Sequence, residues 1–152
     1  MIKTSSMENY SRQIEVRWSD LDPNYHLRHS VYYDWGAYIR LTFLNEYGLT
    51  PSLMHQYHFG PVLFREECVF KREILFGDAV EINLRLTKSR KDFSRLSIVH
   101  EIFKNTETLS AIITVDIAWI DTKLRKLTVP PDEIHKTFDA IPKSKTFEWL
   151  EG

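Results

Sequence analysis

The spacing of apolar residues predicts one long helix in this chain. From Val31 to Tyr47 apolar residues recur every three or four positions, which is typical of a helix that buries one face. Ser30 is a suitable N-cap, and Gly48 stands just past the end, where a C′ glycine belongs. Gly36 lies on the apolar face, although glycine in mid-helix costs about 1 kcal/mol relative to alanine. A close approach of the helix backbone to a flat surface such as a sheet would explain this glycine.

The rest of the chain alternates between apolar and polar residues with a period of two, which indicates strands. We expect a short strand over residues 13–18, followed by a polar loop over 19–29, and a second loop over 49–60. Four longer strands follow near residues 64–70, 80–87, 93–103 and 109–120, with turns such as Gly77-Asp78 between them. Tight turns imply an antiparallel sheet and an α+β fold. Pro130 and Pro131 then open a short helix over 132–138.

The strand at 109–120 carries apolar residues in both alternating sets. Both of its faces would then need cover, and self-association is the simplest way to supply the second layer. This feature gives a first indication of an oligomer.

Composition narrows the class of protein. The 152 residues are enough for one domain, which we place over 1–152, and 43% hydrophobic with 27% charged residues is ordinary for a globular chain. A net charge of −1 argues against a nucleic-acid partner. Residues 1–10 lack the apolar run of a signal peptide, and no segment approaches the roughly 18 apolar residues of a membrane span. We therefore expect a cytoplasmic protein without a membrane partner.

Reactive side chains are concentrated in the loop before the long helix. Asp22, Asn24, His26 and His29 all lie there, together with Asp20. The first N–H groups of a helix have no partner within it and favour negative charge, so amides near Ser30 and Val31 are candidates to hold an oxyanion.

Such a cluster suits thioester hydrolysis. A thiol leaves easily because its pKa is near 8.5, so the reaction needs mainly a carboxylate and an oxyanion hole. Asp22 is the candidate base or nucleophile. Asn24 is placed to orient water or substrate, and His26 to orient Asp22 or share its role as a base.

The run from Val16 through Asp22-Pro23-Asn24-Tyr25-His26 to Leu27, followed by Val31-Tyr32-Tyr33, resembles the signature of the 4-hydroxybenzoyl-CoA thioesterase-like acyl-CoA thioesterases. The Asp-x-Asn-x-His spacing is also similar to that of acyl-carrier-protein thioesterases. The resemblance extends over residues 12–138. It implies a hotdog fold, in which a curved antiparallel sheet of about five strands wraps a long central helix.

The same resemblance implies a homodimer or homotetramer with active sites at the subunit interface, and it makes Asp22 the catalytic aspartate. It implies acyl-CoA or acyl-carrier-protein as substrate and calls for no cofactor or metal. Departures from the family pattern fall beside the helix start. Tyr25 stands where the family often has glycine, and Arg28 and His29 stand where it often has two asparagines. Tyr25 and His29, with Ser30 and Val31, are expected to contact substrate.

Other interpretations of the same residues remain open. Asp22-Pro23-Asn24 is also good turn chemistry without catalysis. The His-x-x-His spacing of His26 and His29 invites a metal site, but it lacks the helical spacing and the glutamate of a zinc protease. An enoyl-thioester hydratase of the same fold, or an acyl-binding protein without catalysis, would use similar residues. The sequence does not choose between CoA and carrier protein, or between acyl chain lengths.

Overall fold

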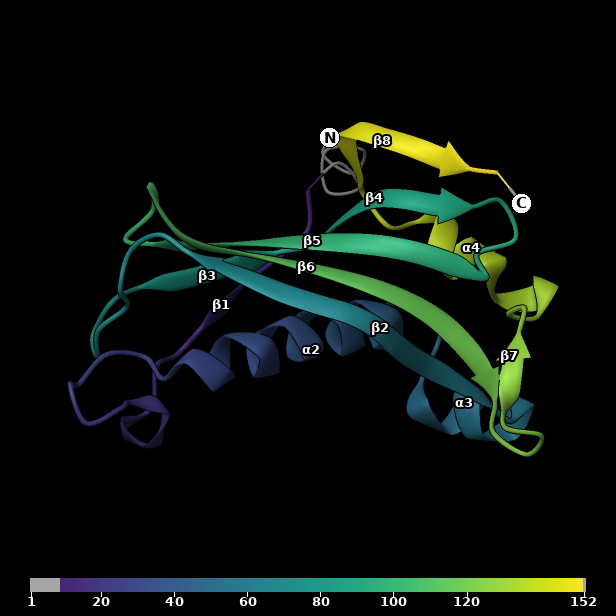
Figure 1. Ribbon diagram of the computed structural model, residues 1–152, viewed down its shortest axis with the longest axis horizontal. Coiled ribbons are helices and arrows are strands. Elements are labelled where there is room, and N and C mark those ends of the chain that lie inside the picture. Colours follow the sequence, from purple (N-terminus) through teal and green to yellow (C-terminus); the bar gives the residue numbers. More distant parts are fainter. Residues whose placement is uncertain (1–8, 152) are drawn as a thin grey trace.

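A computed structural model describes residues 9–151 of the chain (Figure 1). Its strands are β1 (Ser11–Ile14), β2 (Phe59–Phe70), β3 (Val80–Asn83), β4 (Arg85–Arg90), β5 (Arg95–Lys104), β6 (Thr108–Asp121), β7 (Lys126–Thr128) and β8 (Lys143–Leu150). Its helices are α2 (His29–Glu46), α3 (Pro51–Tyr57) and α4 (His135–Asp139), with short 3-10 turns at Trp18–Asp20 and Asp132–Ile134. Within the described residues, no helix is both long and apolar enough to cross a membrane.

The eight strands form one sheet, and every pairing is antiparallel except the one between β4 and β8. This confirms the α+β class, but about five strands had been expected. The predicted strand at 80–87 is split, because β3 and β4 pair one after the other with β5 and Leu84 falls between them. The short β7 and the C-terminal β8 were not predicted. β2 pairs with β6 and with no other strand among residues 9–151.

Helix α2 lies across one face of the curved sheet (Figure 1). Its inner side packs into the core through Val31, Tyr32, Trp35, Ile39 and Phe43, as the helical spacing predicted. Gly48 has a φ of 101°, and the N–H groups of Gly48 and Leu49 donate to the carbonyls of Asn45 and Leu44. This is a Schellman ending, so the predicted C′ glycine is confirmed.

The expected N-cap was wrong. The helix begins at His29 with Arg28 as its N-cap, and no side chain caps it. The hydroxyl of Ser30 instead accepts a hydrogen bond from Arg28 Nε at 3.1 Å. The backbone N–H of Arg28 donates to the carbonyl of Asp20 at 2.7 Å. That bond connects the loop to the start of the helix. The helix therefore begins at His29, two residues before the start at Val31 that the local sequence predicted.

Two further expectations were wrong at element boundaries. The expected loop at 49–60 contains α3, which begins with Thr50 as N-cap and Pro51 as first residue; Thr50 Oγ1 accepts from the N–H of Leu53 at 3.0 Å. The expected strand at 13–18 is β1, which ends at Ile14 because its partner β3 begins at Val80. The alternation beyond Ile14 continues into a 3-10 turn where Trp18 is 73% exposed.

The side chains of β6 are already largely buried within one copy of the chain, so this strand does not by itself require the expected second layer. Ala111, Ile113, Val115 and Ile117 are buried on the helix side. On the opposite side Ser110 and Ala118 are buried, and Ile112, Thr114, Asp116 and Ile120 are half-buried. Among the long elements, β2 and α2 carry several exposed large apolar side chains instead. Leu63, Phe64, Val69, Phe70, Tyr38 and Leu41 are each between 44% and 52% exposed.

Gly36 is the point of close approach between α2 and the sheet. A Cβ atom at this position would lie 3.2 Å from Arg40 Nη1 and 3.3 Å from His100 Cδ2. Arg40 Nη1 donates to His100 Nε2 at 3.0 Å, and His100 Nδ1 lies 2.9 Å from the carbonyl of Asn83. Since arginine only donates, His100 accepts at Nε2 and donates from Nδ1. Burial, together with the charge of Arg40, lowers the pKa of His100 to about 3, so the imidazole is neutral.

Asp20 anchors the loop that carries the candidate site. Its side chain is buried, and it accepts hydrogen bonds from the backbone N–H of Arg17 at 2.9 Å and from the Arg17 guanidinium at 3.0 Å. Burial opposes ionisation of Asp20, but the bonds and charge of Arg17 outweigh it and hold the pKa of this carboxyl below its usual value. Asp20 is therefore a structural carboxylate.

We predict that Gly36→Val lowers the free energy of unfolding by about 1–3 kcal/mol, because its side chain would press on His100 and Arg40. Urea unfolding measures the loss. The matched control is Ala37→Val, which adds the same branched side chain at the next, exposed helical position. Equal losses in both variants would contradict the close approach.

We predict that Asp20→Asn lowers the free energy of unfolding by about 1–3 kcal/mol at pH 7, because a buried charged acceptor is replaced. The pKa of Asp20 is lower when folded, so its contribution is complete above the unfolded pKa of about 3.9 and is lost as pH falls through the folded value. The difference between wild type and variant should therefore shrink below about pH 4. Urea unfolding at pH 7 and at pH 3 measures it, and a difference independent of pH would count against the charged role.

Candidate functional site

Asp22 sits in a tight turn just before α2. Its Oδ1 atom accepts hydrogen bonds from the backbone N–H groups of Asn24 at 2.9 Å and His26 at 3.0 Å. The N–H of Asp22 donates to the carbonyl of His26, and the N–H of Tyr25 donates to the carbonyl of Asp22. Oδ2 accepts no hydrogen bond from residues 9–151. Asp22 therefore serves the turn with one oxygen and keeps the other available.

Tyr25 occupies the tip of this turn with a φ of 67°, in the left-handed region that glycine adopts more easily. The resembled family often has glycine at this position, and the positive φ of the turn explains that preference. The Tyr25 side chain is 65% exposed, and its ring lies 6.4 Å from that of Trp18. Two exposed aromatic rings thus stand beside the turn, and the turn keeps its shape despite the bulky residue.

His26 is held from two directions. Its backbone forms a bridge with Leu75, and the N–H of Leu27 donates to the carbonyl of Ile74. Its Nε2 atom lies 3.3 Å from Oε1 of Glu73, and both side chains are about half exposed. Glu73 stands in the segment between β2 and β3, so sequence reasoning missed it. Its distance along the chain left no local signal.

Tyr32 is a second residue that sequence reasoning placed only in the core. It is buried, and its ring packs against Phe70 at 4.9 Å. Burial raises the pKa of Tyr32 to about 12, and the neighbouring groups Cys68, Asp22 and Glu73 add to this effect. The Tyr32 hydroxyl therefore stays protonated in the neighbourhood of the carboxylates of Asp22 and Glu73.

The start of α2 offers two backbone donors. The N–H groups of His29 and Ser30 have no hydrogen-bond partner in the described part of the chain, and both residues are exposed. The N–H of Val31 was expected to be free to hold an oxyanion, but it donates to the carbonyl of Arg28 at 2.9 Å. The side chain of Val31 is buried. An oxyanion at this helix start would therefore meet His29 and Ser30 rather than Val31.

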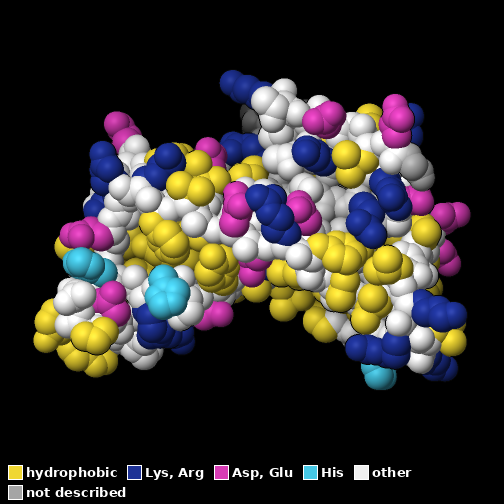
Figure 2. Space-filling view, viewed as in Figure 1, with side chains coloured by type: hydrophobic (Ala, Val, Ile, Leu, Met, Phe, Trp, Pro, Cys, Tyr) yellow, Lys and Arg dark blue, Asp and Glu magenta, His cyan; other side chains and the backbone are white. Residues whose placement is uncertain are grey.

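The expected residues thus gather at one end of the molecule, at the left of Figure 1. The turn of Asp22 and the first turn of α2 are consecutive in the chain, and Glu73 reaches them from the β2–β3 segment. Asn24 is exposed and contributes its backbone to the turn. Figure 2 shows histidine, acidic and hydrophobic side chains side by side on this end. Together they provide a carboxylate, a histidine–glutamate pair and two free amides.

Comparison with known proteins places this site in context. The family model described as thioesterase-like superfamily matches residues 16–138. A hypothetical protein from Staphylococcus aureus solved in complex with CoA has a TM-score of 0.81 at 17% identity, over 95% of this chain and 89% of that chain. DHNA-CoA thioesterase from Staphylococcus aureus has a TM-score of 0.78 at 17% identity, with 86% and 89% covered.

A 1,4-dihydroxy-2-naphthoyl-CoA thioesterase from Synechocystis has a TM-score of 0.76 at 16% identity, with 86% of this chain and 96% of that chain covered. At these identities the likeness concerns the fold. A comparison with curated proteins finds no significant match. The family match spans the Asp22 turn, α2 and the sheet up to α4, and it confirms the resemblance to hotdog-fold thioesterases: the chain belongs to the thioesterase-like superfamily.

Proposed function

We propose that this protein hydrolyses an acyl thioester, carried by CoA or by an acyl carrier protein, to the free acid and the thiol. The observation that carries the proposal is the free Oδ2 of Asp22 in the turn that leads into an 18-residue helix whose first two N–H groups are unpartnered. Family membership and the CoA-thioesterase names among the structural neighbours support the same reaction class.

In the proposed reaction the thioester carbonyl oxygen lies against the N–H groups of His29 and Ser30. Asp22 either removes a proton from the attacking water or attacks the carbonyl itself to form an anhydride that water then opens. Negative charge on the carbonyl oxygen is stabilised by the amides and by the helix dipole. The C–S bond breaks, and the thiol departs without a strong acid because its pKa is near 8.5.

His26 and Asn24 complete the proposed site. In this proposal His26, paired with Glu73, orients Asp22 or shares its role as a base, and Asn24 orients water or substrate. The side chain of Asn24 is exposed on the Asp22 turn, and we place the pantetheine chain of CoA or of a carrier protein beside it. Tyr25 contributes an exposed ring at the same edge.

We predict that Asp22→Asn reduces thiol release at least ~100-fold, equivalent to about 2.7 kcal/mol of barrier. Asparagine keeps an acceptor oxygen for the turn but cannot act as base or nucleophile. Thiol release from short aliphatic, long aliphatic and aromatic acyl-CoAs measures the effect. Asp34→Asn, which neutralises an exposed carboxylate in the early part of the same helix, is the matched control.

The outcomes separate the alternatives. Equal activity of wild type and Asp22→Asn would remove Asp22 from the mechanism. No thiol release by folded wild type from acyl-CoA or acyl-carrier-protein would overturn hydrolysis. Loss of crotonyl-CoA without thiol release would identify a hydratase instead, and tight binding without turnover would identify an acyl-binding protein.

We further propose that the protein is a homodimer joined through β2. The free edge of this twelve-residue strand and the exposed apolar side chains on β2 and α2 form a surface that a monomer would leave open to water (Figure 2). Pro61 and a bulge between Leu63 and Arg65 interrupt the first half of the strand, so the pairing edge is Arg65–Phe70.

We predict that wild type sediments as a dimer or a pair of dimers, and that Val69→Lys shifts it to monomer. Val69 is an exposed apolar residue on the proposed pairing edge, and burying the charge of a lysine there in a dimer interface is unfavourable. Analytical ultracentrifugation measures the mass. Thr114→Lys, one strand further into the same face, is the control. A wild-type protein that is monomeric and fully active would contradict the dimer.

A further inference from the structure

The hairpin that joins β6 to β7 carries cations and exposed aliphatic side chains together. Every residue from Thr122 to Leu127 is exposed. Leu124 at the tip is 68% exposed, Leu127 is 54% exposed and Val129, just beyond β7, is 49% exposed. Interspersed with them are three cations that form no ion pair with any residue in the range 9–151: Lys123, Arg125 and Lys126.

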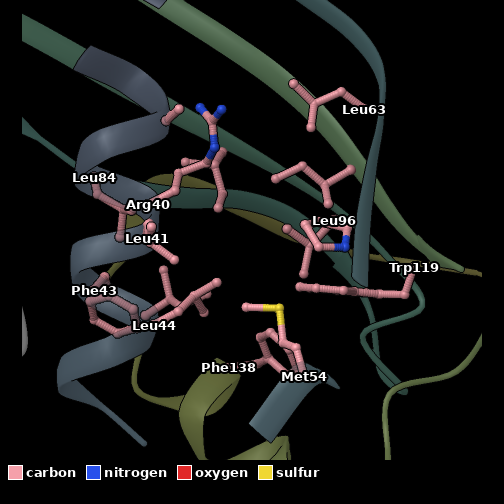
Figure 3. Close-up of a pocket in the computed structure, with 15 residues that line it drawn as sticks. Arg40, Leu41, Phe43, Leu44, Met54, Leu63, Leu84, Leu96, Trp119 and Phe138 are labelled. Atoms are coloured by element: carbon pink, nitrogen blue, oxygen red, sulfur yellow. The ribbon is translucent and has the colours of Figure 1, made fainter. Parts of the chain in front are cut away.

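The base of this hairpin is fixed to the core. Trp119 of β6 pairs with Thr128 of β7, and the side chain of Trp119 is only 2% exposed. Its ring points into the apolar interior beside Met54 and lies 5.2 Å from the ring of Phe138 (Figure 3). Its Nε1 atom donates to the carbonyl of Phe93 at 3.0 Å. The exposed tip therefore stands on a rigid base.

The tip of the hairpin is a defined turn built around Asp121. Its Oδ1 atom accepts hydrogen bonds from the backbone N–H groups of Lys123 and Leu124, each at 2.8 Å, and its carbonyl accepts from the N–H of Arg125 at 2.8 Å. Asp121 is the one carboxylate among residues 119–129, so three cations against one carboxylate leave two net positive charges on this segment. The turn keeps Leu124 exposed at a positively charged tip.

The hairpin projects at a corner of the molecule. It lies beside the end of α3, where the N–H of Thr122 donates to the carbonyl of His58 at 2.8 Å. This corner is at the lower right of Figure 1, at the end opposite the Asp22 turn. Figure 2 shows Lys and Arg side chains next to hydrophobic ones at the same corner. Residues 122–129 include no aromatic side chain of the kind that anchors protein partners. A projecting aliphatic tip flanked by cations instead matches the interface of an anionic bilayer.

We propose that the β6–β7 hairpin docks this protein on an anionic lipid bilayer, with its exposed aliphatic side chains in the headgroup layer and its cations at the lipid phosphates. Each cation near an anionic surface strengthens binding about fivefold, and salt screens this contribution. Docking at this end leaves the Asp22 turn facing water. The proposal does not depend on the proposed hydrolysis. It replaces the expectation, drawn from the lack of a membrane-spanning segment, that a membrane is not a partner.

Co-sedimentation with vesicles tests the docking. One set of vesicles contains equal parts of phosphatidylglycerol and phosphatidylcholine, and the other contains phosphatidylcholine alone. We expect wild type to bind the anionic vesicles at least tenfold more tightly, and added salt to weaken this binding. Lys126→Glu should weaken it at least tenfold, since the charge at that position is reversed. The matched control is Lys145→Glu, which reverses an exposed cation on β8 and should bind as wild type does.

A second pair of variants tests the aliphatic contact. Leu124→Ser should weaken binding to anionic vesicles at least fivefold, because a leucine no longer leaves water on docking. Phe76→Ser, which removes an apolar side chain that is 64% exposed on the segment between β2 and β3, should bind as wild type does.

Three outcomes would overturn the docking. The first is a wild type that binds neither kind of vesicle, or both equally. The second is CoA binding, measured by calorimetry, that weakens in Lys126→Glu, which would assign the cations to the phosphates of CoA. The third is a lower mass of Leu124→Ser in analytical ultracentrifugation, which would assign the hairpin to a contact between copies of the chain.

Discussion

Helix α2 meets the sheet most closely at Gly36, where Arg40 donates a hydrogen bond to the buried His100. This contact sets the position of the whole helix. His100 is fixed by the carbonyl of Asn83, so the helix is registered against β5 by a hydrogen bond as well as by packing. A charged residue at this depth needs a partner, since an unpaired buried charge is strongly unfavourable. The neutral imidazole and Glu66 supply partners, and the N-terminus of α2 is held in place as a result.

Much of this architecture was accessible from the sequence because it depends on local periodicity. The apolar spacing of Val31 to Tyr47 located the helix, and Gly36 indicated a close approach that His100 now explains. The alternation at Val80, Ile82, Leu84 and Leu86 gave the correct buried face. The alternation did not predict the break between β3 and β4, because it continues across the break and all four residues are buried.

The errors came where a distant contact decides a local structure. Ser30 looked like the N-cap, but the backbone bond between Arg28 and Asp20 sets the start of the helix. Asp20 looked like one more loop carboxylate and is buried against Arg17. Glu73 reaches His26 across the turn from the β2–β3 segment. The spacing of residues along the sequence predicts none of these contacts, because the fold of the sheet decides which segments lie next to each other. The missed helix α3 is different, since Thr50-Pro51 carried a local start signal that was not used.

Tyr25 bears on the proposed role of the Asp22 turn. A non-glycine residue in the left-handed region costs of order 1 kcal/mol, and such strain persists where the surrounding structure imposes it. Four hydrogen bonds impose it here, two of them to Oδ1 of Asp22. Glycine would relieve the strain, and the large exposed ring of Tyr25 adds nothing to the core. The exposed ring of Tyr25 lies in the same turn as the free oxygen of Asp22 and precedes the unpartnered amides of the helix start, and this arrangement supports the proposed contact with a substrate.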